Sequence, residues 1–171
     1  MDAGRKSEPT PMKNPTTVAR KSDREVVVTR TFDAPARLVF EAWTKPELFR
    51  QWWVPKSMGM SLLSCEMDVR VGGRYRLEFA HGDSQAAFFG TYKEVAPHSR
   101  LVWTNEESDE GSVTTVTFEE KGGKTLLVMH ELYPSKEALD AAGTGAADVM
   151  VETFEQLDDL LVALGATAAR P

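Results

Sequence analysis

The first candidates for chemistry are His130 and Glu131, two titratable side chains that follow each other at the end of an apolar run. This run predicts a β-strand, and neighbouring residues of a strand point to opposite faces of the sheet. We therefore expect one of the two to face the interior, beside Tyr75 or Tyr92. A histidine there could act as a general acid or base, since its pKa is near neutrality. A buried, hydrogen-bonded histidine is the alternative.

A second polar group lies beside a glycine turn. Asp68 and Arg70 are two residues apart and share one face of a predicted strand, next to Gly72-Gly73. Arg70 could bind an acidic group of a ligand. The alternative is a surface ion pair that fixes the hairpin and contributes about 0–1 kcal/mol. The candidate catalytic residues are thus His130, Glu131, Tyr75 and Arg70.

Nothing in the spacing predicts a metal or a cofactor. The three histidines and the one cysteine are scattered, without the spacing of a metal site. There is no nucleophile elbow, no phosphate-binding glycine loop and no Ser/His/Asp order. Cys65 alternates with apolar residues, which favours a small core residue over a nucleophile.

Aromatic residues are numerous, with four tryptophans. For Trp52, Trp53 and Trp103 the sequence leaves open whether they pack in the core or line a cavity, whereas Trp43 is expected in the core. Aromatic walls with few polar groups would suit an apolar or aromatic ligand.

A long C-terminal helix over residues 145–164 must position these side chains. Its apolar residues recur at spacings of four and three, which places them on one stripe. They are Met150, Phe154, Leu157, Leu161 and Leu164. Thr144 is expected to cap the start of this helix, and Gly165 to follow its last turn. The stripe requires an apolar surface to cover it.

The remaining pattern predicts that surface as a β-sheet. Residues 25–32 form a β-branched run, and two short helices follow between Pro35 and Pro55. Six further strands alternate with turns over residues 60–132, and glycine pairs mark two of the hairpins. Helices placed on one face of consecutive antiparallel strands define an α+β fold.

Length and charge limit the function classes. The 171 residues fit one domain, and the net charge of -6 argues against non-specific binding to nucleic acid or anionic membrane. No apolar run reaches the roughly 18 residues of a membrane span, and one cysteine fits a reducing compartment, so we expect a cytoplasmic protein. Residues 1–22 are interpreted as a disordered leader or tag remnant, 23–165 as the domain and 166–171 as a flexible tail.

Several motifs resemble one family along nearly the whole body. They are residues 32–35, 39–44, 46, 52–55, 68–74, 90–92, 94–97 and 100–104. In this order they resemble the family named after the activator of the heat-shock-protein-90 ATPase. The resemblance implies the helix-grip fold of the START-like (SRPBCC, polyketide cyclase and birch-pollen-allergen) superfamily. In this fold a curved seven-stranded antiparallel sheet wraps around the last helix and leaves a cavity.

One position departs from the family pattern. The family usually has Gly-Trp at the start of the last helix, whereas this chain has Gly145-Ala146. The smaller side chain could widen the entrance of the cavity, or other residues could fill the space.

In the implied fold, the sheet and the last helix both contribute residues to the lining of the cavity. The expected ligand-binding residues are Trp52, Trp53, Leu63, Cys65, Tyr75, Leu77, Phe88, Trp103, His130, Met150 and Phe154. The main hypothesis is a protein that binds a small apolar molecule, aromatic or lipid-like. A cyclase, dehydratase or hydrolase in the same cavity is the alternative. A chaperone-activator or stress-response module ranks third because the sequence contains only the one domain. A homodimer stays open.

Overall fold

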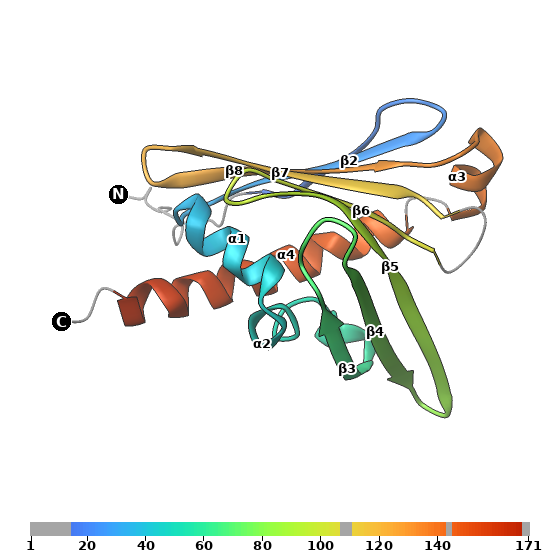
Figure 1. Ribbon diagram of the computed structural model, residues 1–171, viewed down its shortest axis with the longest axis horizontal. Coiled ribbons are helices and arrows are strands. Elements are labelled where there is room, and N and C mark those ends of the chain that lie inside the picture. The colour runs from blue at the N-terminus through green and yellow to red at the C-terminus, as the bar shows by residue number, and fades with distance from the viewer. Residues whose placement is uncertain (1–14, 107–110, 143–144, 169–171) are drawn as a thin grey trace, which may run out of the picture.

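The computed structural model describes residues 15–106, 111–142 and 145–168 (Figure 1). It is an α+β fold in which one long helix lies against an antiparallel sheet, as predicted. The strands are β1 (Thr17–Arg20), β2 (Glu25–Phe32), β3 (Ser61–Met67), β4 (Arg74–His81), β5 (Ser84–Ala96), β6 (Arg100–Thr104), β7 (Val113–Lys121) and β8 (Lys124–Leu132). The helices are α1 (Ala36–Thr44), α2 (Pro46–Phe49), the 3-10 helix η1 (Lys56–Met58), α3 (Lys136–Ala142) and α4 (Gly145–Ala168).

The strands form one sheet in the order β1-β2-β8-β7-β6-β5-β4-β3, and each neighbouring pair is antiparallel. The sheet bends, so that β2, β8 and β7 lie above α4 while β3 and β4 turn down beside it (Figure 1). The seven predicted strands are all present. The helix grip inferred from the sequence is therefore confirmed.

The eighth strand was not predicted. Thr17–Arg20 was assigned to a leader outside the fold, but as β1 it pairs with β2, with Val18 opposite Val28. Four residues are too short to give a strand signal of their own, so the strand depends on the edge of β2 for its partners. The leader interpretation is wrong for these residues, and residues 1–14 lie outside those described.

The predicted stripe of α4 is buried from Met150 to Leu161, with Phe154 and Leu157 at 0 % exposure, and Leu164 is partly buried. The helix continues to Ala168, so Gly165 lies inside it and does not end it. Gly is unfavourable inside a helix by about 1 kcal/mol relative to Ala. The alanines that follow Gly165 are good helix formers and carry the helix on. The predicted cap Thr144 lies outside the described residues.

An aromatic part of the core lies between α1 and the middle of α4. Trp43 contacts Trp52, with 4.8 Å between ring centroids, and Phe154, with 6.2 Å. Phe154 also meets Phe32 of β2 edge to face at 5.7 Å. Aromatic rings therefore fill the space under this half of the sheet.

Candidate functional site

A cavity of about 270 Å³ lies between the sheet and Met150 of α4. Five strands and their following loops contribute to it, and Met150 reaches it from α4. The lining residues are Val26, Val28, Trp53, Phe88, Trp103, Asn105, Gly111, Ser112, Thr114, Met129, Glu131, Tyr133 and Met150. Most of these side chains are apolar, so the cavity suits an apolar molecule.

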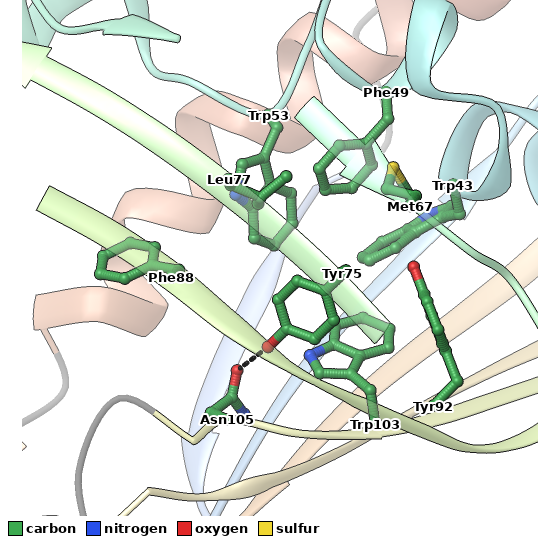
Figure 2. Close-up of a pocket in the computed structure, with 10 residues that line it drawn as sticks. All are labelled: Trp43, Phe49, Trp53, Met67, Tyr75, Leu77, Phe88, Tyr92, Trp103 and Asn105. Atoms are coloured by element: carbon green, nitrogen blue, oxygen red, sulfur yellow. Dashed lines mark hydrogen bonds between the residues drawn. The ribbon is translucent and has the colours of Figure 1, made fainter. Parts of the chain in front are cut away.

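A smaller pocket of about 50 Å³ adjoins the cavity. Trp53, Phe88, Trp103 and Asn105 line both spaces. Figure 2 shows the small pocket, with Tyr75 between Trp103 and the aromatic rings of α1 and the segment after it. The two spaces are therefore parts of one site, a wide part over β7 and β8 and a narrow part over β4 and β5. The full lining of the small pocket is Trp43, Phe49, Trp53, Met67, Tyr75, Leu77, Phe88, Tyr92, Trp103 and Asn105.

The polar groups of the site form one connected network. The Tyr75 hydroxyl donates to the Asn105 side-chain oxygen at 3.0 Å (Figure 2). The Asn105 amide nitrogen donates to the hydroxyls of Ser112 at 3.1 Å and Thr114 at 2.9 Å. Both hydroxyls donate to Oε1 of Glu131, at 2.6 Å from Ser112 and 2.9 Å from Thr114. The network therefore leads from the small pocket to a carboxylate in the wide cavity.

Strand geometry explains why these groups meet. Across the sheet Tyr92 lies opposite Trp103, Trp103 opposite Thr114, and Thr114 opposite Glu131. Residues opposite each other on neighbouring strands share one face of the sheet. This row of side chains across β5, β6, β7 and β8 therefore begins with the aromatic rings of Tyr92 and Trp103 and ends with the carboxylate of Glu131.

The pKa of Tyr133, which lies close to Glu131, is raised above its ordinary value. Burial of the tyrosine is the main cause, and the negative charge of Glu131 adds to it, while a hydrogen bond with Ser112 acts in the opposite direction. Burial likewise raises the pKa of Tyr92 in the small pocket. Both phenols stay protonated at neutral pH and can donate hydrogen bonds.

The small pocket contains a further polar group. The indole Nε1 of Trp43 is buried, and no hydrogen-bond partner for it exists among the described residues. In Figure 2 the Tyr92 hydroxyl points toward the part of the pocket formed by Trp43 and Met67. The Tyr92 hydroxyl gives the narrow end of the site a modest polarity.

A cluster of hydrogen bonds from α4 holds the segment that carries Trp53. The Gln156 amide donates to the carbonyl oxygens of Trp52 and Val54, each at 2.9 Å, and accepts from the Lys56 backbone N–H at 2.9 Å. Glu152 accepts from both the backbone N–H and the hydroxyl of Ser57. These bonds hold the pKa of the Glu152 carboxyl below its usual range. The wall of the site is thus fastened to α4.

Of the four candidate catalytic residues, the structure brings two to the site. Glu131 borders the wide cavity and Tyr75 the small pocket. His130 points to the opposite face of the sheet, where its Nε2 lies 2.7 Å from Oε2 of Glu25. Arg70 is exposed, and its Nε lies 2.9 Å from Oδ2 of Asp68. This is the surface ion pair expected as the alternative to a ligand-binding Arg70.

The expected ligand-binding residues divide in the same way. Those that border the site are Trp53, Tyr75, Leu77, Phe88, Trp103 and Met150. Trp52 and Phe154 instead belong to the core, because both are fully buried against Trp43. The Trp52 indole N–H donates to the Ala42 carbonyl at 2.9 Å.

The two remaining candidates lie on β3. A bulge between Leu62 and Ser64 shifts the register with β4, so Leu63 turns outward and is 49 % exposed. Cys65 is half-buried beside Met67, with 3.6 Å between the sulfur atoms, and is not among the residues that line either pocket. Burial raises the pKa of its thiol, which lowers the reactivity expected of it.

The polar partners of Glu131 are not among the residues predicted from the sequence: they are Asn105, Ser112, Thr114 and Tyr133. A signal existed for Thr114. When the β7–β8 hairpin is paired outward from the Gly122-Gly123 turn, Thr114 falls opposite Glu131. Asn105 and Ser112 follow and precede strands, and no local pattern marks them.

The described residues show neither a metal centre nor a membrane helix. No group of three or more His, Cys, Asp or Glu side chains among them is placed to hold a metal ion. None of the helices within the described ranges has the length and apolar character needed to cross a bilayer.

The fold and the cavity together define a helix-grip protein with an internal apolar site. A profile of the family described as "Activator of Hsp90 ATPase homolog 1-like protein" matches residues 33–162. The match covers most of the chain, so the protein belongs to this family.

Solved structures of bacterial proteins have the same fold. A protein from Rhodobacter sphaeroides is 24 % identical, with a TM-score of 0.80 over 87 % of this chain and 99 % of that one. One from Staphylococcus epidermidis is 27 % identical, with a TM-score of 0.73 over 86 % and 94 %. Another from Chromobacterium violaceum is 25 % identical, with a TM-score of 0.71 over 81 % and 97 %. Among the curated proteins, none matches this chain.

Proposed function

We propose that the protein binds a small hydrophobic molecule, aromatic or lipid-like, in the cavity between the sheet and α4. The observation that carries this proposal is the cavity itself, about 270 Å³ and walled mainly by apolar side chains. An apolar cavity of about 150 Å³ is large enough for benzene. The larger space would accept a bicyclic aromatic ring or a short alkyl chain.

The test fills the cavity from α4. Met150 is 6 % exposed and borders the cavity, so Met150→Trp should occupy the space of the ligand. Isothermal titration with 2-naphthalenemethanol, a neutral bicyclic probe, measures binding. We expect the wild-type protein to bind the probe and the variant to lose about tenfold or more in affinity.

The matched control is Val162→Trp, which adds the same ring at a position of α4 that is 64 % exposed. This variant should bind the probe like the wild type. Thermal unfolding checks that both variants fold, and Met129→Phe fills the cavity from the opposite wall if Met150→Trp does not fold. An absence of binding to the wild type, or equal binding by a folded cavity-filling variant, would refute the proposal.

Glu131 supports a second candidate function, acid–base catalysis of the cyclase, dehydratase or hydrolase type. Among the four candidate catalytic residues, Glu131 is the one that borders the wide cavity. Its carboxylate could accept a proton there from a bound water or substrate. Hydrolysis of 4-nitrophenyl butyrate tests the hydrolase form. A rate above buffer that Glu131→Gln abolishes would support catalysis, and no rate above buffer would remove the hydrolase form.

The third hypothesis, a chaperone-interaction module, rests on the family description alone. A pull-down with the chaperone tests it, and we expect no enrichment.

A further inference from the structure

The charge of the cavity is one-sided. Among the described residues that line the two pockets, Glu131 is the only acidic one, and none is Lys, Arg or His. The rest of the lining is apolar, aromatic or neutral and polar. A molecule that enters the site therefore meets a negative charge and no positive one on these walls.

The acid lies at one end of an otherwise aromatic row. Glu131 and Trp103 are separated by Thr114 on the strand between them. Neighbouring strands are about 4.8 Å apart, so the two positions are about 10 Å apart along the sheet. That distance corresponds to the length of a bicyclic ring with one short substituent.

The hydrogen bonds orient the acid for a positive or donating group. The hydroxyls of Ser112 and Thr114 both donate to the same oxygen, Oε1 of Glu131. The Asn105 amide in turn donates to these hydroxyls, so the donors of the network all point toward the carboxylate. A network of this direction stabilises the negative charge of Glu131, and that charge opposes a second one nearby.

We infer that the ligand is an apolar amine whose protonated nitrogen pairs with Glu131 and whose ring or chain lies over Trp103. This inference rests on the proposed function, because it concerns the chemistry of the molecule bound in the same cavity. A fatty acid or an aromatic acid would place its carboxylate beside Glu131, and none of the described lining residues is a cation that could compensate, so the site should reject such anions.

Three naphthalene probes of nearly equal size test this selectivity by isothermal titration at pH 7. They are 2-naphthalenemethylamine, which is cationic, 2-naphthalenemethanol, which is neutral, and 2-naphthoate, which is anionic. A hydrogen bond to a charged group is worth enough for about a tenfold difference in affinity. The wild type should therefore bind the amine about tenfold more tightly than the alcohol, and the acid most weakly.

Glu131→Gln keeps the shape of the side chain and removes the charge. In this variant the amine should lose about tenfold in affinity and with it its advantage over the alcohol, and thermal unfolding checks that the variant folds. Glu155→Gln, on the exposed side of α4, makes the same change in net charge and should leave the amine preference unchanged.

The outcomes separate the two proposals. If none of the three probes binds the wild type, the proposed function fails. If the alcohol binds but the amine has no advantage, or keeps its advantage in Glu131→Gln, the assignment of Glu131 is overturned while the apolar site stands.

Discussion

A single glycine gives Tyr75 its place in the site. A Cβ atom on Gly90 would lie 1.7 Å from the Thr104 carbonyl oxygen and 2.9 Å from Cε2 of Tyr75. The Thr104 carbonyl also accepts the Tyr75 hydroxyl at 3.0 Å. The close approach of β5 to β6 therefore depends on the absence of a side chain at residue 90.

Gly90→Ala should destabilise the fold and disturb the small pocket. Because the first contact is with backbone, the strand must move, and overpacking of this kind costs about 1–3 kcal/mol. Urea unfolding measures the loss. The control is Gly165→Ala, which has nothing within 4 Å and lies inside α4, so it should stabilise by about 1 kcal/mol. Equal stability of Gly90→Ala and the wild type would contradict this account.

The choice between His130 and Glu131 shows how far residue-level prediction reaches. The sequence predicts that the two point to opposite faces, and they do. It does not decide which faces inward, because β8 carries apolar residues on both faces, such as Leu126 and Leu127. The decision comes from the pairing of β8 with β2 and β7, which places Glu131 with Val26 and Thr114.

At the scale of elements, α4 has two roles along its length. Its middle packs Phe154 and Leu157 into the core, while Met150 near its start borders the cavity. Its half-buried face holds the segment after α2 through Gln156. Because Trp53 lies on that segment and Met150 on α4 itself, α4 positions both side chains at the site.

Gln156→Ala should loosen this wall. The change removes three hydrogen bonds, of which each contributes about 0.5–1.5 kcal/mol, so we expect a loss of about 1.5–4.5 kcal/mol in unfolding free energy. Acrylamide should also quench Trp53 more readily. Glu155→Ala, an exposed neighbour on the same helix, serves as the control and should change neither quantity. Unchanged quenching in Gln156→Ala would show that α4 does not hold the wall.

The sequence predicts elements with a strong period and misses those that depend on distant partners. The stripe of α4 and the glycine hairpins are confirmed because their signals are local. The bulge at Leu63 has no local signal, and alternation alone would place this side chain inside. The core positions of Trp52 and Phe154 follow from how α1 crosses α4, which periodicity does not specify.

At the scale of the whole molecule, the bend of the sheet creates more space than α4 fills. Aromatic rings around Trp43 close one half of that space. The other half, between Met129 and Met150, contains the cavity with Glu131 on its wall. The family resemblance predicts such a cavity in general, but its polar network and the place of Glu131 in it emerge only when the strands are assembled.

NMR of the methionine methyl groups gives the sharpest test of whether an apolar molecule binds in the cavity between the sheet and α4. Met129 and Met150 line the cavity, whereas Met58 is 43 % exposed on η1 and lines neither pocket. On titration with 2-naphthalenemethanol, the methyl signals of Met129 and Met150 should shift together and saturate, while that of Met58 stays in place. Shifts confined to Met58, or no shifts at saturating probe, would contradict the account.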